Sequence, residues 1–333
     1  MPLSRRRPRQ VLPYERVNHA LRVEEPGLST TVQDLGRPSA ISSGVPPGGA
    51  MDRFAHSAAN LLVGNGQGAA TLECTLSGPH VVAEQSCLVA ITGADFDPHV
   101  NGKPVPRWTG VFLGRGDRLT FAGRRAGARA YIAVAGGIGG AGWLGSLSTN
   151  LMAARGGVHG RALRAGDVID IGGEPTKPTI SGRRMPEHLR PDYADHTLHA
   201  IAGPHFKRLD SEGRRLLFNA EFTVTKDSDR MGYRLDGPRL ETSGDELLSF
   251  GLAAGAIQLP SGGQPILLMA DHQTAGGYPV VAGVVSASLP IAAQLMPGDK
   301  LRFAEVSAER ARQMRSALAT ALDSLRSAPA REG

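Results

Sequence analysis

Short apolar and β-branched segments recur along the chain, and glycine, proline or aspartate bounds each of them. Clear examples are Cys87–Thr92, Ala130–Ala135, Glu221–Thr225 and Pro265–Met269. Segments of this length and composition are typical of β-strands. The sequence also holds 43 Gly and 23 Pro residues, and that density of turn formers favours sandwiches or barrels over helical folds. We therefore predict a mainly β protein with few helices.

A weak internal repeat supports this prediction. Three segments, Gly116–Phe121, Gly166–Ile171 and Gly298–Phe303, each begin with Gly-Asp and continue with alternating apolar positions. The aspartate is suited to a turn, and the alternation marks one face of a sheet. We interpret the repeat as a recurring way of starting a strand.

Two segments carry apolar residues at helical spacing. Met51–Val63 is followed by Gly64, a common residue just beyond a helix end. Ser307–Ser327 has a longer apolar stripe, and Ser307 can cap its N-terminus. We predict a C-terminal helix over residues 307–327 that packs against its own domain or against a partner protein.

A stretch rich in proline and arginine divides the chain. It lies between the second Gly-Asp repeat and a new strand-like segment, His196–Ala202. Such a composition is typical of a connection between domains. We predict a disordered basic lead over residues 1–22, a first domain over 23–174, a linker over 175–195 and a second domain over 196–306.

The formal net charge of +6 raises the question of a nucleic acid partner. Four of the positive charges, Arg5, Arg6, Arg7 and Arg9, lie in the first ten residues, and the other basic residues alternate with acidic ones. Only 5% of the residues are aromatic, which leaves few side chains for base stacking. We predict no nucleic acid partner, with an electrostatic tether in the basic lead as the alternative.

Several other classes of protein are disfavoured by composition. No window approaches the ~18 uninterrupted apolar residues of a membrane-spanning helix, and no apolar segment follows the N-terminal arginines as the core of a signal peptide would. The only cysteines are Cys74 and Cys87, which fits a reducing compartment. We expect a cytoplasmic protein without a metal site, since no cluster of His, Cys and Asp has the spacing of metal ligands.

Polar side chains gather in two glycine-punctuated clusters. The first covers Thr30–Arg37 and Gly44–Asp52. The second covers Leu268–Val280, where an apolar run delivers Asp271 and the next three residues into a turn rich in glycine. Taken alone, the pattern of the second cluster favours a polar hairpin loop over a functional site.

These clusters occur in one order with Ala58–Asn65, Asp229–Leu235 and Gly255–Pro260. The set, from about Val23 to Val306, resembles the KipA family of biotin-dependent carboxyltransferase-like proteins. That family includes the C component of 5-oxoprolinase, which is also described as allophanate hydrolase subunit 2-like, and the second half of the carboxyltransferase domain of urea carboxylase. The resemblance implies cyclophilin-like β-barrel domains packed against one another.

The resemblance and the side-chain chemistry together suggest site residues. A carboxylate, an amide, a hydroxyl and a phenol can recognise a compact polar ring such as a lactam or a cyclic urea. We therefore select as catalytic candidates Asp271, Gln273, Thr274 and Tyr278, and as substrate-binding candidates Gln33, Asp34, Arg37, Asp229, Arg230, Gly276 and Gly277.

Alternatives remain open for some of these residues. Arg37 can fork onto a substrate carboxylate or carboxyphosphate, or it can pair internally with Asp34 or Asp52. The segment around Asp229 favours a structural turn over a catalytic site. His272 replaces the arginine that is common in the family; adjacent side chains in an extended strand point to opposite faces, so we expect Asp271 to face the pocket.

For function, the resemblance implies a component of an ATP-dependent 5-oxoprolinase that opens 5-oxo-L-proline to L-glutamate. Its implied partners are a KipI-like B component and a LamB/YcsF-like A component of the same enzyme. The chain has no phosphate-binding loop, so we expect ATP to act at the level of the complex and the isolated chain to be inactive. One alternative is the carboxyltransferase component of a urea carboxylase-like system, with carboxybiotin on a separate carrier. Another is a non-catalytic regulatory partner of a KipI-like kinase inhibitor.

Overall fold

The computed structural model of the protein describes residues 19–172 and 181–327. Residues 1–18 of the expected lead and the first part of the expected linker lie outside this range. Residues 19–22, which the sequence assigned to the lead, belong instead to strand β1, His19–Glu25. This strand pairs with two others, and both Ala20 and Leu21 are fully buried. Burial of this apolar pair explains why residues 19–22 belong to a strand of the first half.

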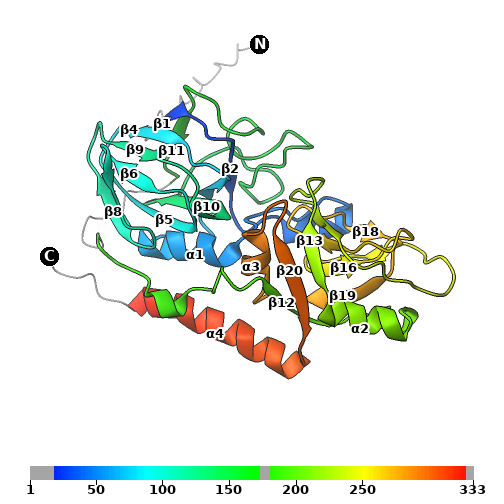
Figure 1. Cartoon of the computed structure of the whole chain (residues 1–333). Coiled ribbons are helices and arrows are strands. Elements are labelled where there is room, and N and C mark those ends of the chain that lie inside the picture. Colours follow the sequence, from blue (N-terminus) through cyan, green and yellow to red (C-terminus); the bar gives the residue numbers. More distant parts are fainter. Residues whose placement is uncertain (1–18, 173–180, 328–333) are drawn as a thin grey trace, which may run out of the picture.

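The first half of the chain forms two sheets with a shared apolar core (Figure 1). The six-stranded sheet has the order β11-β1-β4-β9-β6-β7, and the five-stranded sheet has the order β2-β3-β10-β5-β8. The strands after β1 are β2 Ser29–Gln33, β3 Thr71–Thr75, β4 His80–Ala83, β5 Cys87–Asp95, β6 Pro98–Val100, β7 Lys103–Pro104, β8 Gly110–Leu113, β9 Arg118–Phe121, β10 Ala126–Val134 and β11 Val168–Asp170.

Strand β5 shows why its sequence is apolar without interruption. Val89 and Ile91 contribute to the core between the two sheets, whereas Leu88 and Ala90 pack with helix α1 (Arg53–Leu62) on the other face. A strand that is covered on both faces needs apolar residues at every position. The five-stranded sheet is therefore the middle layer of the first half.

The second half closes into a seven-stranded barrel with the order β12-β19-β16-β17-β14-β13-β20. Parallel pairing of β12 with β20 completes the closure, and Phe222 and Phe303 pack against each other in the core. The prediction of a mainly β fold with a closed barrel is confirmed. The barrel strands are β12 Thr197–Ala202, β13 Glu221–Val224, β14 Gly232–Asp236, β16 Ala256–Gln258, β17 Ile266–Leu268, β19 Val280–Val284 and β20 Lys300–Glu305. Two further strands of this half, β15 Phe250–Gly251 and β18 Ala275–Gly276, pair with each other in a separate two-stranded sheet.

The three Gly-Asp repeats share one local structure. Each glycine has a left-handed φ, of 88°, 88° and 94° at Gly116, Gly166 and Gly298. Each following aspartate accepts a hydrogen bond from the backbone N–H three residues before it, at distances of 2.7, 2.8 and 2.9 Å. Strands β9, β11 and β20 begin just after these turns, so the predicted strand starts are confirmed.

Four α-helices stand out in the described parts of the chain: α1 Arg53–Leu62, α2 Ser211–Asn219, α3 Leu289–Ala293 and α4 Ala308–Ser327. Ser307 Oγ accepts a hydrogen bond of 3.1 Å from Arg310 N, which confirms the predicted cap of the C-terminal helix. Helix α4 runs beneath both halves in Figure 1, and near its C-terminal end it packs against α1 through Ala321 and Leu325. None of the described helices has the length and apolar character needed to cross a membrane.

Candidate functional site at the boundary between the halves

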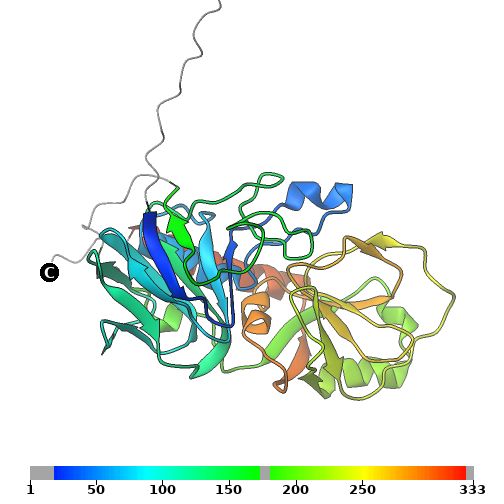
Figure 2. The same ribbon diagram turned by 90° about the horizontal axis from the view of Figure 1, so that it is seen from above.

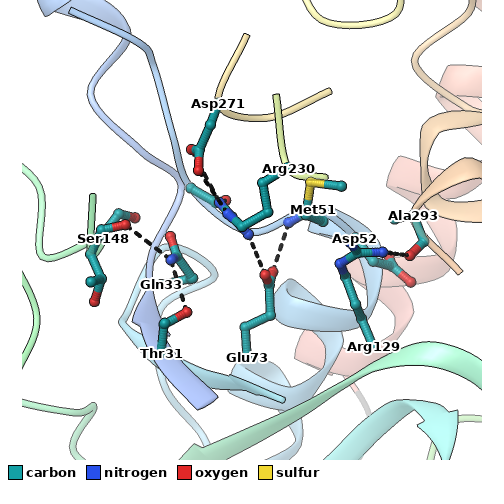
Figure 3. Close-up of polar contacts among 12 residues, drawn as sticks. Thr31, Gln33, Met51, Asp52, Glu73, Arg129, Ser148, Arg230, Asp271 and Ala293 are labelled. Atoms are coloured by element: carbon teal, nitrogen blue, oxygen red, sulfur yellow. Dashed lines mark hydrogen bonds and ion pairs between the residues drawn. The ribbon is translucent and has the colours of Figure 1, made fainter. Parts of the chain in front are cut away.

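The two halves lie side by side (Figure 2), and a dense group of polar side chains fills the boundary between them (Figure 3). Asp271 and Arg230, both from the barrel half, form its outer end. Arg230 Nε donates to Asp271 Oδ2 at 2.8 Å, and Arg230 Nη2 lies 3.3 Å from Asp271 Oδ1. This two-point contact fixes the plane of the carboxylate.

Asp271 lies in a turn that follows β17, as the glycine-rich pattern of Leu268–Val280 predicts. Its N–H donates to Arg230 O at 2.8 Å, and the N–H of His272 donates to Met269 O at 3.2 Å. The side chains of Asp271 and His272 are therefore not related by the alternation of an extended strand. His272 is nonetheless buried, and its Nδ1 lies 2.7 Å from Gln273 O.

Arg230 reaches across the boundary to the first half. Its Nη1 forms a short ion pair with Glu73 Oε1, and its Nη2 donates to Gly49 O at 2.7 Å. Burial opposes the charge of Arg230, but the carboxylates of Glu73 and Asp271 overcome this and raise its pKa. Arg230 thus links the candidate site to the core of the other half.

Glu73 lies on β3 and is only 1% exposed. Its Oε2 accepts from Met51 N at 2.8 Å and from Tyr131 Oη at 2.7 Å. Burial alone raises the pKa of a carboxyl group, yet Arg230 and the backbone donor among others bring the pKa of Glu73 below its usual value. A buried carboxylate with this many donors is held in its charged form.

Asp52 connects the helix α1 cap to the barrel half. Its Oδ1 accepts from Ala55 N at 2.9 Å, and its Oδ2 accepts from Tyr193 Oη at 2.8 Å and from Gln294 Nε2 at 2.9 Å. Complete burial raises the pKa of Asp52 to about 6, since the three hydrogen bonds offset only part of the desolvation.

Arg129 reaches across the boundary from the first half to the barrel half. This buried side chain of β10 donates from Nη1 to Tyr233 Oη at 2.8 Å and to Ala293 O at 2.6 Å. Tyr233 and Ala293 belong to the barrel half, so Arg129 of the first half has its hydrogen-bond partners in the barrel half. In the same way, Arg230 of the barrel half has its ion-pair partner Glu73 in the first half.

Asp34 organises the loops of the first half near Asp271. Its carboxylate accepts from Gly36 N at 2.7 Å, from Ser146 Oγ at 2.7 Å, from Leu147 N at 2.6 Å and from Ser148 Oγ at 2.5 Å. Burial acts against ionisation, but these donors lower the pKa of Asp34. All four donors belong to the first half itself, so Asp34 holds the loop around Ser148 in position.

Arg37 adopts neither of the internal pairings considered from the sequence. In the described structure it forms no ion pair with Asp34 or Asp52; its Nη2 makes a short hydrogen bond to Ser148 O, and its guanidinium stacks 4.8 Å from the ring of Trp143. The side chain is only 1% exposed, and Nε and Nη1 have no hydrogen-bond partner. Two nitrogen atoms of a buried cation are thus left without a hydrogen-bond partner.

A small cavity of about 160 Å³ opens beside Asp271. Asp229 also lines it, but the carboxylate of Asp229 accepts from Met231 N at 2.7 Å and so closes a turn, as the structural alternative proposed. Loops of both halves complete the wall. The lining residues are Pro46, Asn150, Leu151, Met152, Asp229, Arg230, Met231 and Asp271.

The remaining sequence candidates lie elsewhere. Gln33 is buried in β2 and donates to Thr31 Oγ1 at 3.0 Å and to Thr149 O at 3.2 Å. Gln273 Nε2 donates to Gln258 Oε1 at 3.1 Å, beside Gly276.

Three further candidates follow Gln273 along the chain. The carbonyl of Thr274 accepts from Leu252 N at 2.9 Å. Gly277 and Tyr278 line a separate, larger cavity of about 630 Å³, where Tyr278 is 49% exposed. The structure therefore brings together Asp271, Arg230 and Asp229, with Arg37 nearby, and does not bring Tyr278 to the same cavity.

Sequence reasoning did not select Glu73, Arg129 or Gln294. Glu73 carries one detectable signal, a carboxylate in the otherwise uncharged strand segment Thr71–Thr75. A charge in such a segment requires a buried partner. Among the described residues, no three His, Cys, Asp or Glu side chains are grouped so as to hold a metal ion.

Comparison with known proteins gives consistent matches. The chain is 37% identical to the 5-oxoprolinase C component of Escherichia coli (strain K12) over 298 residues, which cover 89% of this chain and 94% of that protein. It is 33% identical to the 5-oxoprolinase C component of Haemophilus influenzae over 297 residues, covering 89% of this chain and 94% of the relative. The crystal structure of the K. lactis urea amidolyase superposes with a TM-score of 0.87 at 29% identity, covering 96% of this chain and 21% of that chain.

The family model described as "Carboxyltransferase domain, subdomain A and B" matches residues 43–305. This match includes the barrel, helix α1, Glu73, Arg230 and Asp271. The chain belongs to the carboxyltransferase domain family, subdomains A and B.

Proposed function

We propose that this protein is the C component of a 5-oxoprolinase, which opens 5-oxo-L-proline to L-glutamate with consumption of ATP. Two relatives that carry this name match nearly their whole length and most of this chain. The observation that carries the proposal at the level of the site is Asp271, a carboxylate clamped by Arg230 at a small cavity between the two halves.

The size of the cavity suits a compact substrate. At about 160 Å³ it is smaller than the ~300–1,000 Å³ pockets that hold drug-sized ligands. A five-membered lactam offers one N–H donor and one carbonyl acceptor, and Asp271 can accept the N–H or orient the attacking water. Arg230 holds the carboxylate in place for either role.

At about 160 Å³ the cavity is too small for a nucleoside triphosphate. Arg230 is already paired with Glu73 and Asp271, and the glycine-rich segment 136–142 lacks the lysine and the following helix of a phosphate-binding loop. We therefore assign ATP to the complex rather than to this chain. The relatives are named as one of several components of an enzyme, which supports partner proteins, and we propose KipI-like and LamB/YcsF-like partners in a cytoplasmic complex.

Reconstitution tests this function. The chain is mixed with the candidate KipI-like and LamB/YcsF-like partners, and the release of glutamate and of ADP from 5-oxoproline and ATP is followed. We expect turnover only in the complete mixture, and none with the purified chain alone. Equal ATP hydrolysis by the isolated chain, or no glutamate from the complete mixture, would contradict the proposal.

One observation supports a second candidate. The similarity to the K. lactis urea amidolyase covers 96% of this chain, so the same fold occurs within a urea-processing protein. The alternative is a carboxyltransferase component that works with carboxybiotin on a separate carrier. Glutamate formation in the reconstituted mixture decides against it, whereas transfer of carboxylate to urea by a mixture that contains a biotin carrier decides for it.

A further inference from the structure

A groove runs between helix α4 and the barrel half, apart from the candidate site. Two cavities form it, with volumes of about 400 and 390 Å³. They share the lining residues Ala254, Ser286 and Arg315, so they are neighbouring parts of one groove. None of their lining residues belongs to the 160 Å³ cavity beside Asp271. The groove is therefore a separate place where a ligand can enter.

The second cavity of the groove, which we call the α4 cavity, has mainly apolar walls. They come from helix α1, helix α3, helix α4 and the segment before Asp271. The larger apolar side chains among them are Phe54, Met269, Leu289, Pro290, Leu318 and Leu322. A volume of about 390 Å³ lies within the ~300–1,000 Å³ of sites for small molecules, whose walls are mostly apolar with a few polar groups. The α4 cavity thus has the size and the surface of such a site.

The charged groups along the groove are all cationic. Arg53 and Arg315 line the α4 cavity, Arg312 and Arg315 line its neighbour, and neither described lining contains an aspartate or a glutamate. Two of these arginines are engaged: Arg312 pairs with Glu309 at 2.8 Å, and Arg53 Nη2 donates to Leu35 O at 3.2 Å. The side chain of Arg315 forms no ion pair or hydrogen bond within residues 19–172 and 181–327. Arg315 is also exposed, so its guanidinium is available to an anion.

The groove therefore matches a ligand with an apolar chain and one anionic head. A carboxylate suits the head, because a guanidinium can bind both of its oxygens. The lining follows α4 from Ala311 to Leu322, a span of about 16 Å along the helix axis. A helix of a partner protein is a poorer match. With side chains it is about 10–12 Å across, so two turns would occupy roughly 1,000 Å³, more than either cavity offers.

We propose that the groove between α4 and the barrel half binds a fatty carboxylate. The alkyl chain lies in the α4 cavity, between α4 and α3, and the carboxylate pairs with Arg315, where the two cavities meet. This site does not depend on the proposed function, since none of the residues assigned to the reaction lines it.

Calorimetric titration of the purified full chain at neutral pH tests the site. The probes are hexanoate, octanoate and decanoate, each below the concentration at which it forms micelles. We expect the affinity to rise about 4-fold for each added methylene group, because each one leaves water for an apolar wall. Octanoate should bind about 5-fold more tightly than 1-octanol, which lacks the charge that Arg315 attracts.

Two alanines of α4 provide a matched pair of variants. Ala319 lines the α4 cavity and Ala317 lines neither cavity, and both residues are exposed. Ala319→Phe places a ring in the cavity and should weaken decanoate binding about 10-fold or more, whereas Ala317→Phe should leave it unchanged.

A second pair of variants tests the carboxylate head. Arg315→Gln should abolish the preference for octanoate over 1-octanol. Arg310→Gln, at an exposed position of α4 that lines neither cavity, should retain it.

Several results would overturn this site. They are no binding of decanoate, equal affinity for the three acids, and decanoate binding that survives Ala319→Phe. The titrations of the unaltered chain decide the question even if a variant fails to fold.

Sedimentation with vesicles of phosphatidylglycerol and phosphatidylcholine distinguishes a free fatty carboxylate from a lipid surface. We expect the chain to bind decanoate and to stay in the supernatant. If the chain sediments with the vesicles, Ala319→Phe abolishes this and free decanoate does not bind, the groove serves a membrane and the proposal is wrong.

Discussion

Gln294 Nε2 donates a hydrogen bond of 2.9 Å to Asp52 Oδ2, which joins a loop of the barrel half to the cap of helix α1 in the other half. The other hydrogen bonds of the Gln294 amide go to the backbone of β10. Its Oε1 accepts from Ala128 N at 3.1 Å and from Arg129 N at 3.0 Å, and its Nε2 also donates to Arg129 O at 3.0 Å. No other residue type offers two donors and an acceptor in this geometry.

Replacing Gln294 by alanine is therefore expected to destabilise the protein. Two backbone N–H groups and the buried carboxylate of Asp52 lose a partner, and losses of this kind cost about 3–5 kcal/mol in total. Urea denaturation measures the change. The control is Gln313→Ala on the exposed face of α4, which should stay within about 0.5 kcal/mol of the parent. Equal midpoints for the two variants would contradict this role of Gln294.

Asp52 is expected to make stability depend on pH. Burial raises its folded-state pKa to about 6 from an ordinary value of 3.8, so the folded protein binds a proton more readily than the unfolded chain. This group therefore destabilises the fold above pH 6, and the cost disappears as the pH falls toward 4. The full difference corresponds to about 3 kcal/mol.

Comparison with Asp52→Asn isolates this contribution. The depressed pKa values of Asp34 and Glu73 act in the opposite direction, because the stability they provide is lost on acidification, but they are common to both proteins. Urea midpoints are measured at pH 7 and pH 4. The stability of the parent relative to Asp52→Asn should rise by up to about 3 kcal/mol on acidification. Parallel profiles would show that Asp52 titrates normally.

Asp271→Asn should separate activity from stability. The substitution keeps the shape of the side chain but removes the charge that Arg230 contacts and that we propose for the reaction. We therefore expect about a 10²-fold loss of turnover in the reconstituted complex. The melting temperature should fall by only a few degrees. Asp227→Asn, at an exposed position on the turn before Arg230, is the control and should retain full turnover. If both variants keep full turnover, Asp271 is not at the reacting centre.

The Arg230 and Glu73 pair is expected to show strong coupling. Arg230→Met leaves the nearly buried Glu73 without its cation, and breaking a buried ion pair in this way costs about 3–5 kcal/mol. Glu73→Gln in addition should recover part of that loss, since the charge that was left unpaired is removed. A double-mutant cycle of denaturation free energies gives the coupling energy. Additive effects of the two substitutions would argue that the pair is not coupled in solution.

The parts of the fold that depend on neighbouring residues could be predicted from the sequence. The cap at Ser307 and the Gly-Asp turns at Gly116, Gly166 and Gly298 are set by contacts within three residues. A pattern of spacing and turn chemistry is enough to identify such features.

The site depends instead on distant contacts. The turn at Asp271 is held by hydrogen bonds to distant residues, from Asp271 N to Arg230 O and from Gly48 N to Ala270 O. The alternation of neighbouring side chains in a strand therefore could not predict how Asp271 is oriented. Glu73 meets a partner 157 residues away and Gln294 one 242 residues away. Periodic patterns of apolar and polar residues carry no information about partners so far apart in the sequence. The family resemblance indicated the loop of Asp271, but only the three-dimensional structure shows that Arg230 binds the carboxylate of Asp271.

Helix α4 and the polar boundary have a joint consequence for how the protein melts. Each half has its own apolar core, and halves of that kind often unfold in separate steps. Here Arg129 and Glu73 would lose their partners if either half unfolded alone, while α4 contacts helix α1 and also lines a groove beside the barrel. An intermediate with only one half folded would expose the charges of Arg129 and Glu73 and also the apolar face of helix α4. We therefore expect the two halves to unfold as a single cooperative unit, so that a calorimetric scan contains one endotherm for the whole chain.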